Sequence, residues 1–151
     1  MPPQRNEPGI YTLILALPRP EQMVVGSLGA IDFPQGYYSY TGSARGTGGL
    51  KRLDRHILVS QGIKKVVRWH IDYLLPKACF LEAFITKTPL DLECCIARAI
   101  GERLTPVPGF GCTDCRCVSH LHRSAELQDM RDAVSLAHSR HNCSSGRRQD
   151  W

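Results

Sequence analysis

Two tyrosine motifs, followed by an arginine and a histidine one helical turn apart, bring together residue types that can hydrolyse a phosphodiester bond. Tyr11 ends the motif Gly-Ile-Tyr, Tyr40 opens the motif Tyr-Thr-Gly-Ser-Ala, and Arg52 precedes His56 by four residues. Hydrolysis needs an activated water, a group that cancels charge on the phosphate oxygens, and a protonated or metal-bound leaving oxygen. The planar fork of Arg52 suits a phosphate, and His56 can relay a proton or bind phosphate. A phenol, with a pKa of about 10, acts as a base only beside a cation or metal.

In order and spacing these residues resemble the motif of the GIY-YIG nucleases. In that family a Tyr-x-Gly-Ser/Lys-Ala turn leads into a helix with an arginine and, four residues later, a tyrosine or histidine. Two features depart from most members: residues 12–39 form a long connection between the tyrosines, and the turn at residues 46–49 lengthens the path to Arg52. A subfamily of small GIY-YIG-like proteins, labelled a domain of unknown function, is more similar over about residues 9–120. Its pattern matches Gly36-Tyr37-Tyr38, the segment from Trp69 to Leu74, and the segment from Cys115 to His120.

The resemblance implies a nuclease site built on two adjacent strands. Tyr11 and Tyr40 would lie side by side, face one cleft with their hydroxyls and handle the attacking water. Arg52 would bind the phosphate and His56 would transfer a proton. The family also uses one divalent ion, Mg²⁺ or Mn²⁺, held by a glutamate on a helix after the third strand, and Glu93 best matches that context. An oxygen ligand suits either ion. Three nearby carboxylates remain alternatives for this ligand: Asp72, Glu82 and Asp91.

Residues close to the motif could contact nucleic acid. The turn after Tyr40 leads towards a helix start, so Ser43 and Ala44 would present backbone or hydroxyl donors beside a phosphate. A basic run follows the helix and could contact phosphates, although such runs are more often solvated loops; it contains Lys64, Lys65 and Arg68. The formal net charge of +5 and the pI near 8.9 favour a polyanionic partner. We therefore expect nucleic acid, in particular DNA, as the partner, with a repair protein as a possible second one, and the oligomeric state stays open.

A second group of residues offers soft and borderline metal ligands late in the chain. Cys115, Cys117 and His120 match the subfamily pattern, whereas Cys112 and His122 lie beside them. These ligand types suit Zn²⁺, but one short loop cannot easily surround an ion with four ligands. A fourth ligand could come from a distant cysteine, Cys94 or Cys95. The competing interpretation is a set of buried thiols with a packed or hydrogen-bonding histidine.

Length and composition indicate one packed domain. The chain has 151 residues, of which 42% are hydrophobic. We expect a single domain over residues 1–140 and a polar, disordered tail over residues 141–151. No apolar run approaches the ~18 residues of a membrane span, and no secretory cleavage pattern follows the first apolar run. Seven cysteines without an export signal indicate reduced thiols or metal ligands, so we expect a cytoplasmic protein without a membrane partner.

Periodicity predicts an α/β chain of the α+β type, with a small, mainly antiparallel sheet flanked by helices. Runs of branched and aromatic residues between turn residues predict strands over residues 10–17, 23–25, 28–33, 37–41 and 80–86. Helical intervals predict helices from about residue 50 to 61, 89 to 104 and 124 to 140. In the first of these helices, Leu50, Leu53, Ile57 and Gln61 would form the buried side. Arg52 and His56 would then lie on another, accessible face.

The function that these patterns favour is a metal-dependent endonuclease acting on DNA, with a repair-associated role as one setting. The rival is a nucleic-acid-binding or repair-accessory module that kept the fold and lost turnover. In that case Tyr11 and Tyr40 are ordinary strand tyrosines, and Arg52 only positions a backbone phosphate. A third class, a zinc-stabilised interaction domain, requires that removal of zinc unfolds the protein.

Overall fold

The centre of the protein is a six-stranded antiparallel sheet. The computed structural model describes residues 7–44, 49–65, 67–112, 117–140 and 147–150. The strand order is β6-β7-β4-β1-β5-β8, and every neighbouring pair is antiparallel. The sheet strands are β1 (Gly9–Leu17), β4 (Gly36–Ser43), β5 (Cys79–Lys87), β6 (Thr105–Pro106), β7 (Leu121–Ser124) and β8 (Arg147–Asp150). A separate hairpin pairs β2 (Glu21–Val24) with β3 (Ala30–Phe33). The predicted α+β class with an antiparallel sheet is confirmed.

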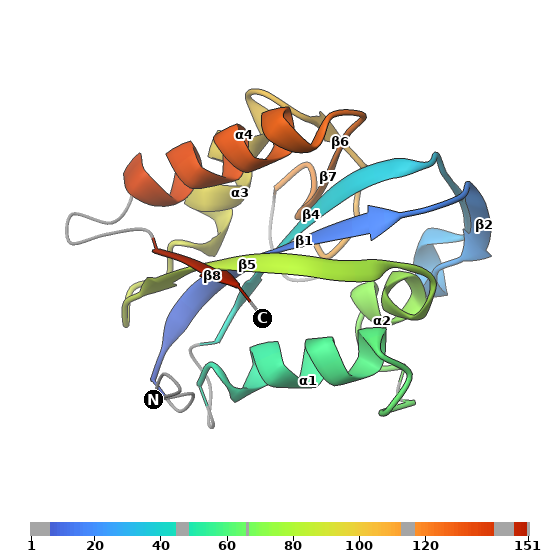
Figure 1. Cartoon of the computed structure of the whole chain (residues 1–151), viewed down its shortest axis with the longest axis horizontal. Coiled ribbons are helices and arrows are strands. Elements are labelled where there is room, and N and C mark those ends of the chain that lie inside the picture. The colour runs from blue at the N-terminus through green and yellow to red at the C-terminus, as the bar shows by residue number, and fades with distance from the viewer. Residues whose placement is uncertain (1–6, 45–48, 66, 113–116, 141–146, 151) are drawn as a thin grey trace.

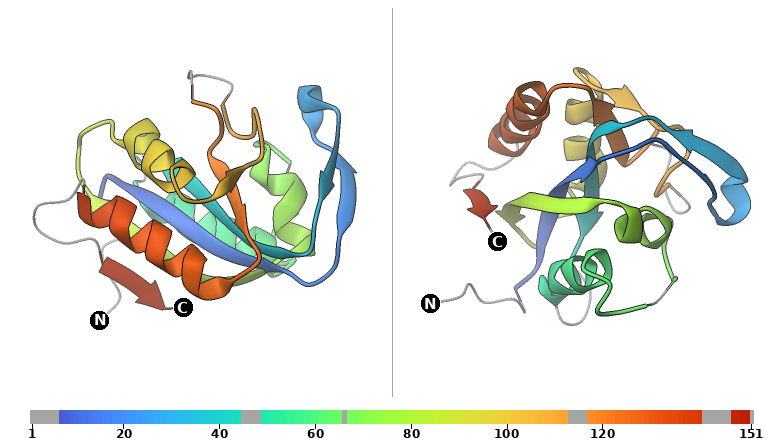
Figure 2. Two further views of the ribbon diagram at one scale, coloured as in Figure 1. Left: turned by 90° about the horizontal axis from the view of Figure 1, so that it is seen from above. Right: turned by 45° about the vertical axis from the view of Figure 1, so that its right-hand side comes forward.

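Within the described residues, four helices cover the two faces of the sheet (Figure 1). They are α1 (Lys51–Ser60), α2 (Ile71–Leu74), α3 (Glu93–Gly101) and α4 (Leu127–Arg140), with short 3-10 turns at Gly26–Leu28 and Leu75–Lys77. Helices α1 and α2 lie on one face and α3 and α4 on the other, as both views of Figure 2 also show. Within the described residues, no helix has both the length and the apolar character that crossing a membrane requires.

Strand β1 is central and has both faces buried. Tyr11 and Leu13 pack in the hydrophobic core on the α1 side, whereas Ile10 and Ile14 pack in the second core, under α3 and α4. Side chains of a strand alternate between the two faces of a sheet. A strand with a core on each side therefore needs an almost continuous apolar run, which is what residues 10–17 provide.

The structure differs from the predicted elements at strand β7, at the ends of two helices and at strand β8. Strand β7 falls where the sequence predicts a Cys/His cluster followed by a helix, because Leu-His-Arg-Ser has no apolar alternation; β7 pairs with β4 nevertheless. Helix α3 begins at Glu93 rather than at residue 89, and α4 begins at Leu127 rather than at residue 124. Instead of continuing a disordered tail, Arg147–Asp150 form β8 against β5; residues 141–146 and 151 lie outside the described part of the chain.

Candidate active site

The two motif tyrosines lie on neighbouring strands and share one face of the sheet. In the register of β1 and β4, Tyr11 is opposite Gly42 and Tyr40 is opposite Leu13. Both rings belong to the core on the α1 side, with Tyr11 fully buried and Tyr40 5% exposed. The sequence prediction that the tyrosines lie side by side agrees with this register. The Tyr11 hydroxyl does not face an open cleft, however, because this side chain is fully buried and its hydroxyl lies against His56.

Gly42 leaves the space that the Tyr11 ring occupies. A Cβ atom built on Gly42 would lie 2.5 Å from the Tyr11 hydroxyl oxygen and 2.6 Å from its Cζ. No side chain fits at that distance unless the ring moves. The glycine of the Tyr-Thr-Gly motif is therefore needed for close approach, since the phenol of β1 lies directly across the backbone of β4.

We predict that Gly42→Ala destabilises the fold by about 1–3 kcal/mol, because the added methyl group overpacks a buried contact. Urea unfolding of the two proteins measures the loss. Ser43→Ala, one residue further along the same strand, is the control and should change the free energy of unfolding by less than about 0.5 kcal/mol. A Gly42→Ala protein as stable as the wild type would show that the Tyr11 ring has room to move.

His56 joins the two tyrosines from the helix side. Its Nε2 lies 2.7 Å from the Tyr11 hydroxyl, and its ring meets the Tyr40 ring edge-on with 5.9 Å between centroids. The side chain is fully buried together with Leu53 and Val59, so the prediction that His56 lies on the accessible face of the helix is wrong. The cause is the hydrogen bond to Tyr11, which gives this polar ring a partner inside the core.

The pKa values of this group favour neutral side chains. Burial, assisted by the charge of Arg52, lowers the pKa of His56 to about 3. Burial also raises the pKa of Tyr11 well above 10.0, and the neighbouring Tyr40 and Glu93 raise it further. The pKa of Tyr40 is raised mainly by burial; Arg52 lowers it and Glu93 raises it. A neutral imidazole can accept the proton of the Tyr11 hydroxyl at Nε2, while His56 Nδ1 is buried without a hydrogen-bond partner among the described residues.

This burial predicts a loss of stability in acid. The pKa of His56 is about 3 in the folded protein, against the ordinary histidine value of 6.5 in the unfolded chain, so the unfolded chain binds the proton first as the pH falls. The stability that depends on a neutral His56 is fully present above pH 6.5 and is lost as the pH falls towards 3. We therefore expect the free energy of unfolding to be about 2–3 kcal/mol lower at pH 4.5 than at pH 7.5. Urea unfolding at both pH values should show this loss and a smaller one in His56→Gln. Equal losses in the two proteins would contradict the assignment to His56.

Arg52 is held beside the tyrosines with part of its guanidinium still available. Nη1 donates to the backbone carbonyl of Ser43 at 2.9 Å, and Cζ lies 4.1 Å from the centre of the Trp69 ring. Its Nε is buried and has no hydrogen-bond partner within the described chain. A buried donor without a partner is costly, so this atom indicates a place for an acceptor such as a phosphate oxygen. Unlike His56, the Arg52 side chain is only half-buried.

A tryptophan surrounded by arginines lies next to Arg52. Arg55 and Arg68 also lie over the Trp69 ring, with Cζ at 4.3 Å and 5.6 Å from its centre. Asp72 anchors this segment, because its carboxylate accepts two hydrogen bonds from Arg55 and the backbone N–H groups of Arg68 and Trp69. Burial would raise the pKa of Asp72, but these hydrogen bonds lower it. Asp72 is thus engaged in holding the loop, which makes it a poor metal ligand.

Glu93 is the carboxylate whose charge acts on both motif tyrosines. It is the first residue of α3, its side chain is 25% exposed, and its charge raises the pKa of both Tyr11 and Tyr40. Of the alternatives, Glu82 is buried against Arg131 of α4, on the other face of the sheet, and Asp91 is exposed. The structure therefore favours Glu93 among the predicted carboxylates.

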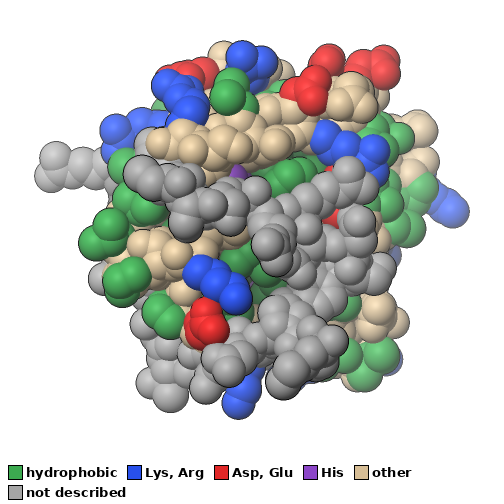
Figure 3. All heavy atoms as spheres, turned by 60° about the vertical axis from the view of Figure 1, so that its left-hand side comes forward, with side chains coloured by type: hydrophobic (Ala, Val, Ile, Leu, Met, Phe, Trp, Pro, Cys, Tyr) green, Lys and Arg blue, Asp and Glu red, His purple; other side chains and the backbone are tan. Residues whose placement is uncertain are grey.

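Not every predicted contact residue joins this group. Ser43 contributes its carbonyl to Arg52, and the backbone N–H of Ala44 donates to the carbonyl of Gly9. Lys64 and Lys65 are exposed on the loop after α1. On the face drawn in Figure 3, the coloured Lys and Arg side chains are mixed with Asp and Glu side chains, so this part of the described surface has no single basic patch.

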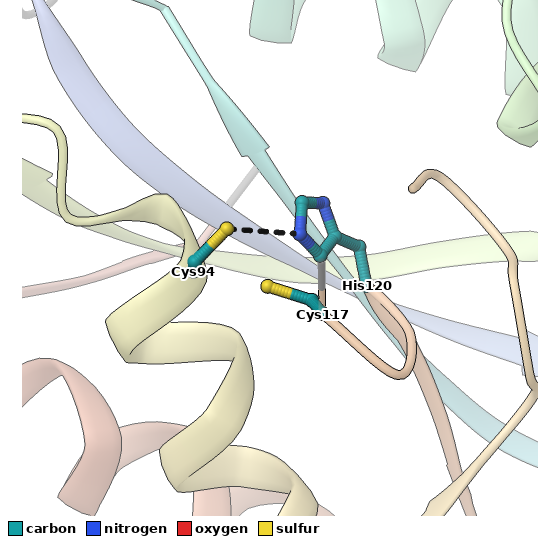
Figure 4. A group of neighbouring side chains, drawn as sticks. All are labelled: Cys94, Cys117 and His120. Carbon is teal, nitrogen blue, oxygen red and sulfur yellow. Dashed lines mark hydrogen bonds between the residues drawn. The ribbon is translucent and has the colours of Figure 1, made fainter. Parts of the chain in front are cut away.

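A second group, of two cysteines and a histidine, lies close to Tyr40. The ligand atoms of Cys94, Cys117 and His120 all lie within 4.8 Å of one another, and Figure 4 shows the Cys94 thiol directed towards the imidazole with the Cys117 thiol beside it. This group could hold a metal ion. Cys117 and His120 were predicted, whereas Cys115 lies outside the described residues. The third member is Cys94, one of the two distant cysteines considered from the sequence.

Cys112 and His122, which also belong to the late cluster, make other contacts. The Cys112 thiol donates to the carbonyl of Phe110 at 3.5 Å. His122 is buried in β7, and burial together with the charge of His120 lowers its pKa to about 4. Neither belongs to the group of three.

Trp69 and Arg55 are site residues that sequence reasoning missed. Trp69 stood in one of the segments that carry the resemblance, but nothing in that segment says that its ring would pack on Arg52. Arg55 is next to His56 in sequence and is not among the predicted site residues. The sequence offers only the presence of Asp72 further along the chain as a signal. Folding brings the two side chains together as an ion pair, with 3.1 Å between Arg55 Nη2 and Asp72 Oδ2.

The fold and the site together define an α+β domain in which a buried tyrosine–histidine pair lies beside an arginine and a half-buried glutamate. The chain belongs to the family described as "Domain of unknown function DUF123", whose match covers residues 10–143. That match includes each of the candidate site residues from Tyr11 to His120. No curated protein and no solved structure gives a significant match to the chain.

Proposed function

We propose that this protein is a metal-dependent endonuclease of the GIY-YIG type that hydrolyses DNA phosphodiester bonds. The observation that carries the proposal is the buried pair of Tyr11 and His56, joined at 2.7 Å, next to an Arg52 Nε that has no hydrogen-bond partner in the described chain. A hydrogen-bonded pair supported by a cation is the kind of arrangement that activates water and stabilises phosphate charge. The resemblance of the tyrosine motifs to that nuclease family agrees with this chemistry.

Glu93 fits the role of ligand to Mg²⁺ or Mn²⁺. Its carboxylate is partly exposed and near both tyrosines, and Mg²⁺ binds through one or two carboxylates while keeping several waters. The ion would supply Lewis-acid stabilisation of the charge on the phosphate. Neutralising Glu93 would also remove the negative charge that raises the pKa of Tyr11 and Tyr40, and so make their phenolate forms easier to reach.

The protein residues would divide the remaining tasks. Tyr40 is the motif tyrosine with some solvent exposure, 5%, and would orient the attacking water. Tyr11 and His56 would support it from inside the core as a neutral, hydrogen-bonded pair. Arg52 would donate from Nε to a phosphate oxygen, since Nη1 is already used by Ser43. The ring of Trp69 keeps the guanidinium in place.

DNA binding would extend from this site over the loop after α1. Arg68 and Trp69 lie next to Arg52, and Lys64 and Lys65 are exposed on the same loop. Such cations contact phosphates without reading sequence. A repair protein could then supply specificity for the substrate.

A second candidate is an accessory module that binds nucleic acid without cleaving it. The full burial of Tyr11 and His56 favours this candidate, because a substrate cannot touch fully buried side chains directly. The two functions separate when labelled duplex DNA is first bound in EDTA and Mg²⁺ or Mn²⁺ is then added. A nuclease converts the bound DNA to shorter products after the addition, whereas an accessory module leaves it intact and retained.

A further inference from the structure

We propose that Zn²⁺ binds to the Sγ atoms of Cys94 and Cys117 and to Nε2 of His120, and that the bound ion holds the Glu93 carboxylate in place through the other nitrogen of His120. Zinc binding here is independent of the proposed nuclease function. Only the importance of Glu93 rests on that function. In this arrangement Glu93 is the Mg²⁺ or Mn²⁺ ligand, and His120 is its positioning residue.

The chemistry of the three donors selects the ion. Two thiols and one imidazole are soft and borderline ligands, which bind Zn²⁺ far better than Mg²⁺. Around a tetrahedral Zn²⁺, with bonds of about 2.0–2.3 Å, such atoms lie roughly 3.5–3.8 Å apart. Cys94 Sγ is 3.8 Å from His120 Nε2, and the atoms of all three residues fall within 4.8 Å of one another. Small side-chain rotations would bring them to bonding distance. Three protein ligands suffice when water takes the fourth position.

The backbone presents these ligands from structures that are already tied together. Cys94 is the second residue of α3, while Cys117 and His120 precede β7. The late segment is fixed by hydrogen bonds from Gly109 N to Val118 O at 2.8 Å and from His120 N to Phe110 O at 2.9 Å. His120 is buried and the two cysteines are half-buried. The ordering of the site is therefore largely provided by the fold, which favours tight binding.

His120 connects the cysteines to the carboxylate. Its Nε2 faces Cys94, whereas its Nδ1 lies 3.7 Å from Glu93 Oε2. A metal on Nε2 leaves the proton of the neutral ring on Nδ1, where it can be donated to Glu93. A carboxylate that receives the second N–H of a metal-bound histidine is a common way of fixing both groups. Zinc would thus set the direction of the Glu93 side chain.

The same segment also touches Tyr40. The backbone N–H of Thr41 donates to the carbonyl of His120 at 3.0 Å. A Cβ atom on Gly111 would lie 3.1 Å from the Cβ of His120 and 3.3 Å from Cε1 of Tyr40, so Gly111 lies in a narrow space between these two side chains. A displacement of His120 would therefore change the position of Tyr40 as well as that of Glu93.

The first experiment measures zinc. Full-length protein is reduced, given one equivalent of Zn²⁺, desalted and analysed for metal content, and a parallel sample is loaded with Co²⁺ to detect thiolate coordination by absorbance. We expect about one Zn²⁺ per chain in the wild type and in Cys95→Ser, the matched control next to Cys94. Affinity should fall at least tenfold in Cys94→Ser and Cys117→Ser. Absence of zinc and of the cobalt–thiolate band in the wild type, unchanged affinity in both variants, or a Cys94–Cys117 disulfide in its place would overturn the site.

The second experiment measures positioning without cleavage. Binding of Mn²⁺ to zinc-loaded wild type, Cys95→Ser and Cys94→Ser is followed by electron paramagnetic resonance, after circular dichroism has shown that each protein is folded. Second-sphere partners of metal sites change affinity by about 10–100-fold, so we expect Mn²⁺ to bind at least tenfold more weakly to Cys94→Ser. Equal affinity in the three proteins would overturn the positioning role. A wild type that binds zinc and Mn²⁺ but cleaves no DNA would retain this inference and remove the nuclease proposal alone.

Discussion

Arg52→Ala should lower the rate of DNA cleavage by about 10²–10³-fold, the usual effect of removing one donor that stabilises transition-state charge. The guanidinium is fixed between the Ser43 carbonyl at 2.9 Å and the Trp69 ring at 4.1 Å, and its Nε has no hydrogen-bond partner among the described residues. A phosphate oxygen that gains charge during hydrolysis would be the third partner of the guanidinium. DNA binding should weaken far less, because the exposed cations of the neighbouring loop contribute independently.

The measurement is a single-turnover cleavage rate at saturating protein, which separates chemistry from binding. Lys51→Ala is the control, since Lys51 is the exposed neighbouring cation at the start of the same helix, and its rate should stay within about threefold of the wild type, as expected of a surface charge outside the site. Arg52→Lys should recover only part of the activity, because an ammonium keeps the charge but lacks the planar fork. A wild-type rate in Arg52→Ala would remove Arg52 from the mechanism.

Glu93→Gln should abolish metal-dependent cleavage and is the second large effect that we predict. The substitution keeps the size of the side chain and removes the negative charge that a hard divalent cation requires. It also removes the charge that raises the pKa of Tyr11 and Tyr40. Without its carboxylate ligand the ion has to be held by water and DNA alone, so activity should need a much higher Mg²⁺ concentration or disappear.

A titration of cleavage against Mg²⁺ concentration measures this effect. Asp91→Asn is the matched control: the residue is exposed, two positions before Glu93, and precedes helix α3. It should follow the wild-type curve. If Asp91→Asn lost activity while Glu93→Gln kept it, the metal ligand would be assigned to the wrong carboxylate. A loss in neither variant would place the ion elsewhere.

The sequence predicted those parts of the fold that depend on local patterns. The apolar run of β1 and the two tyrosine motifs placed Tyr11 and Tyr40 on strands that pair as expected. Strand β7 was missed because two of its four residues are His122 and Arg123, and its strand character comes from pairing with β4 rather than from its own composition. The same is true of β8, whose pairing partner β5 lies more than 60 residues earlier in the chain.

The site was predictable in its residue types and much less so in their environments. Helical spacing placed Arg52 and His56 on one face, yet His56 is buried and Arg52 is half-buried. The burial of His56 depends on its hydrogen bond to the Tyr11 hydroxyl inside the core. Likewise, Cys94 joins His120 across 26 positions of sequence. No periodicity reports contacts of that kind, since they arise from how α3 packs against the strands.

Nicking of supercoiled plasmid by the wild-type protein is the most direct test of the claim that this site is a phosphodiesterase centre. The purified 16.9 kDa chain is fractionated by size, and each fraction is assayed with Mg²⁺ or Mn²⁺ and again with EDTA. The predicted result is nicked DNA that follows the protein through the fractions, appears with either ion and is absent in EDTA. Protein fractions that bind the plasmid but leave it supercoiled with both ions would contradict the claim.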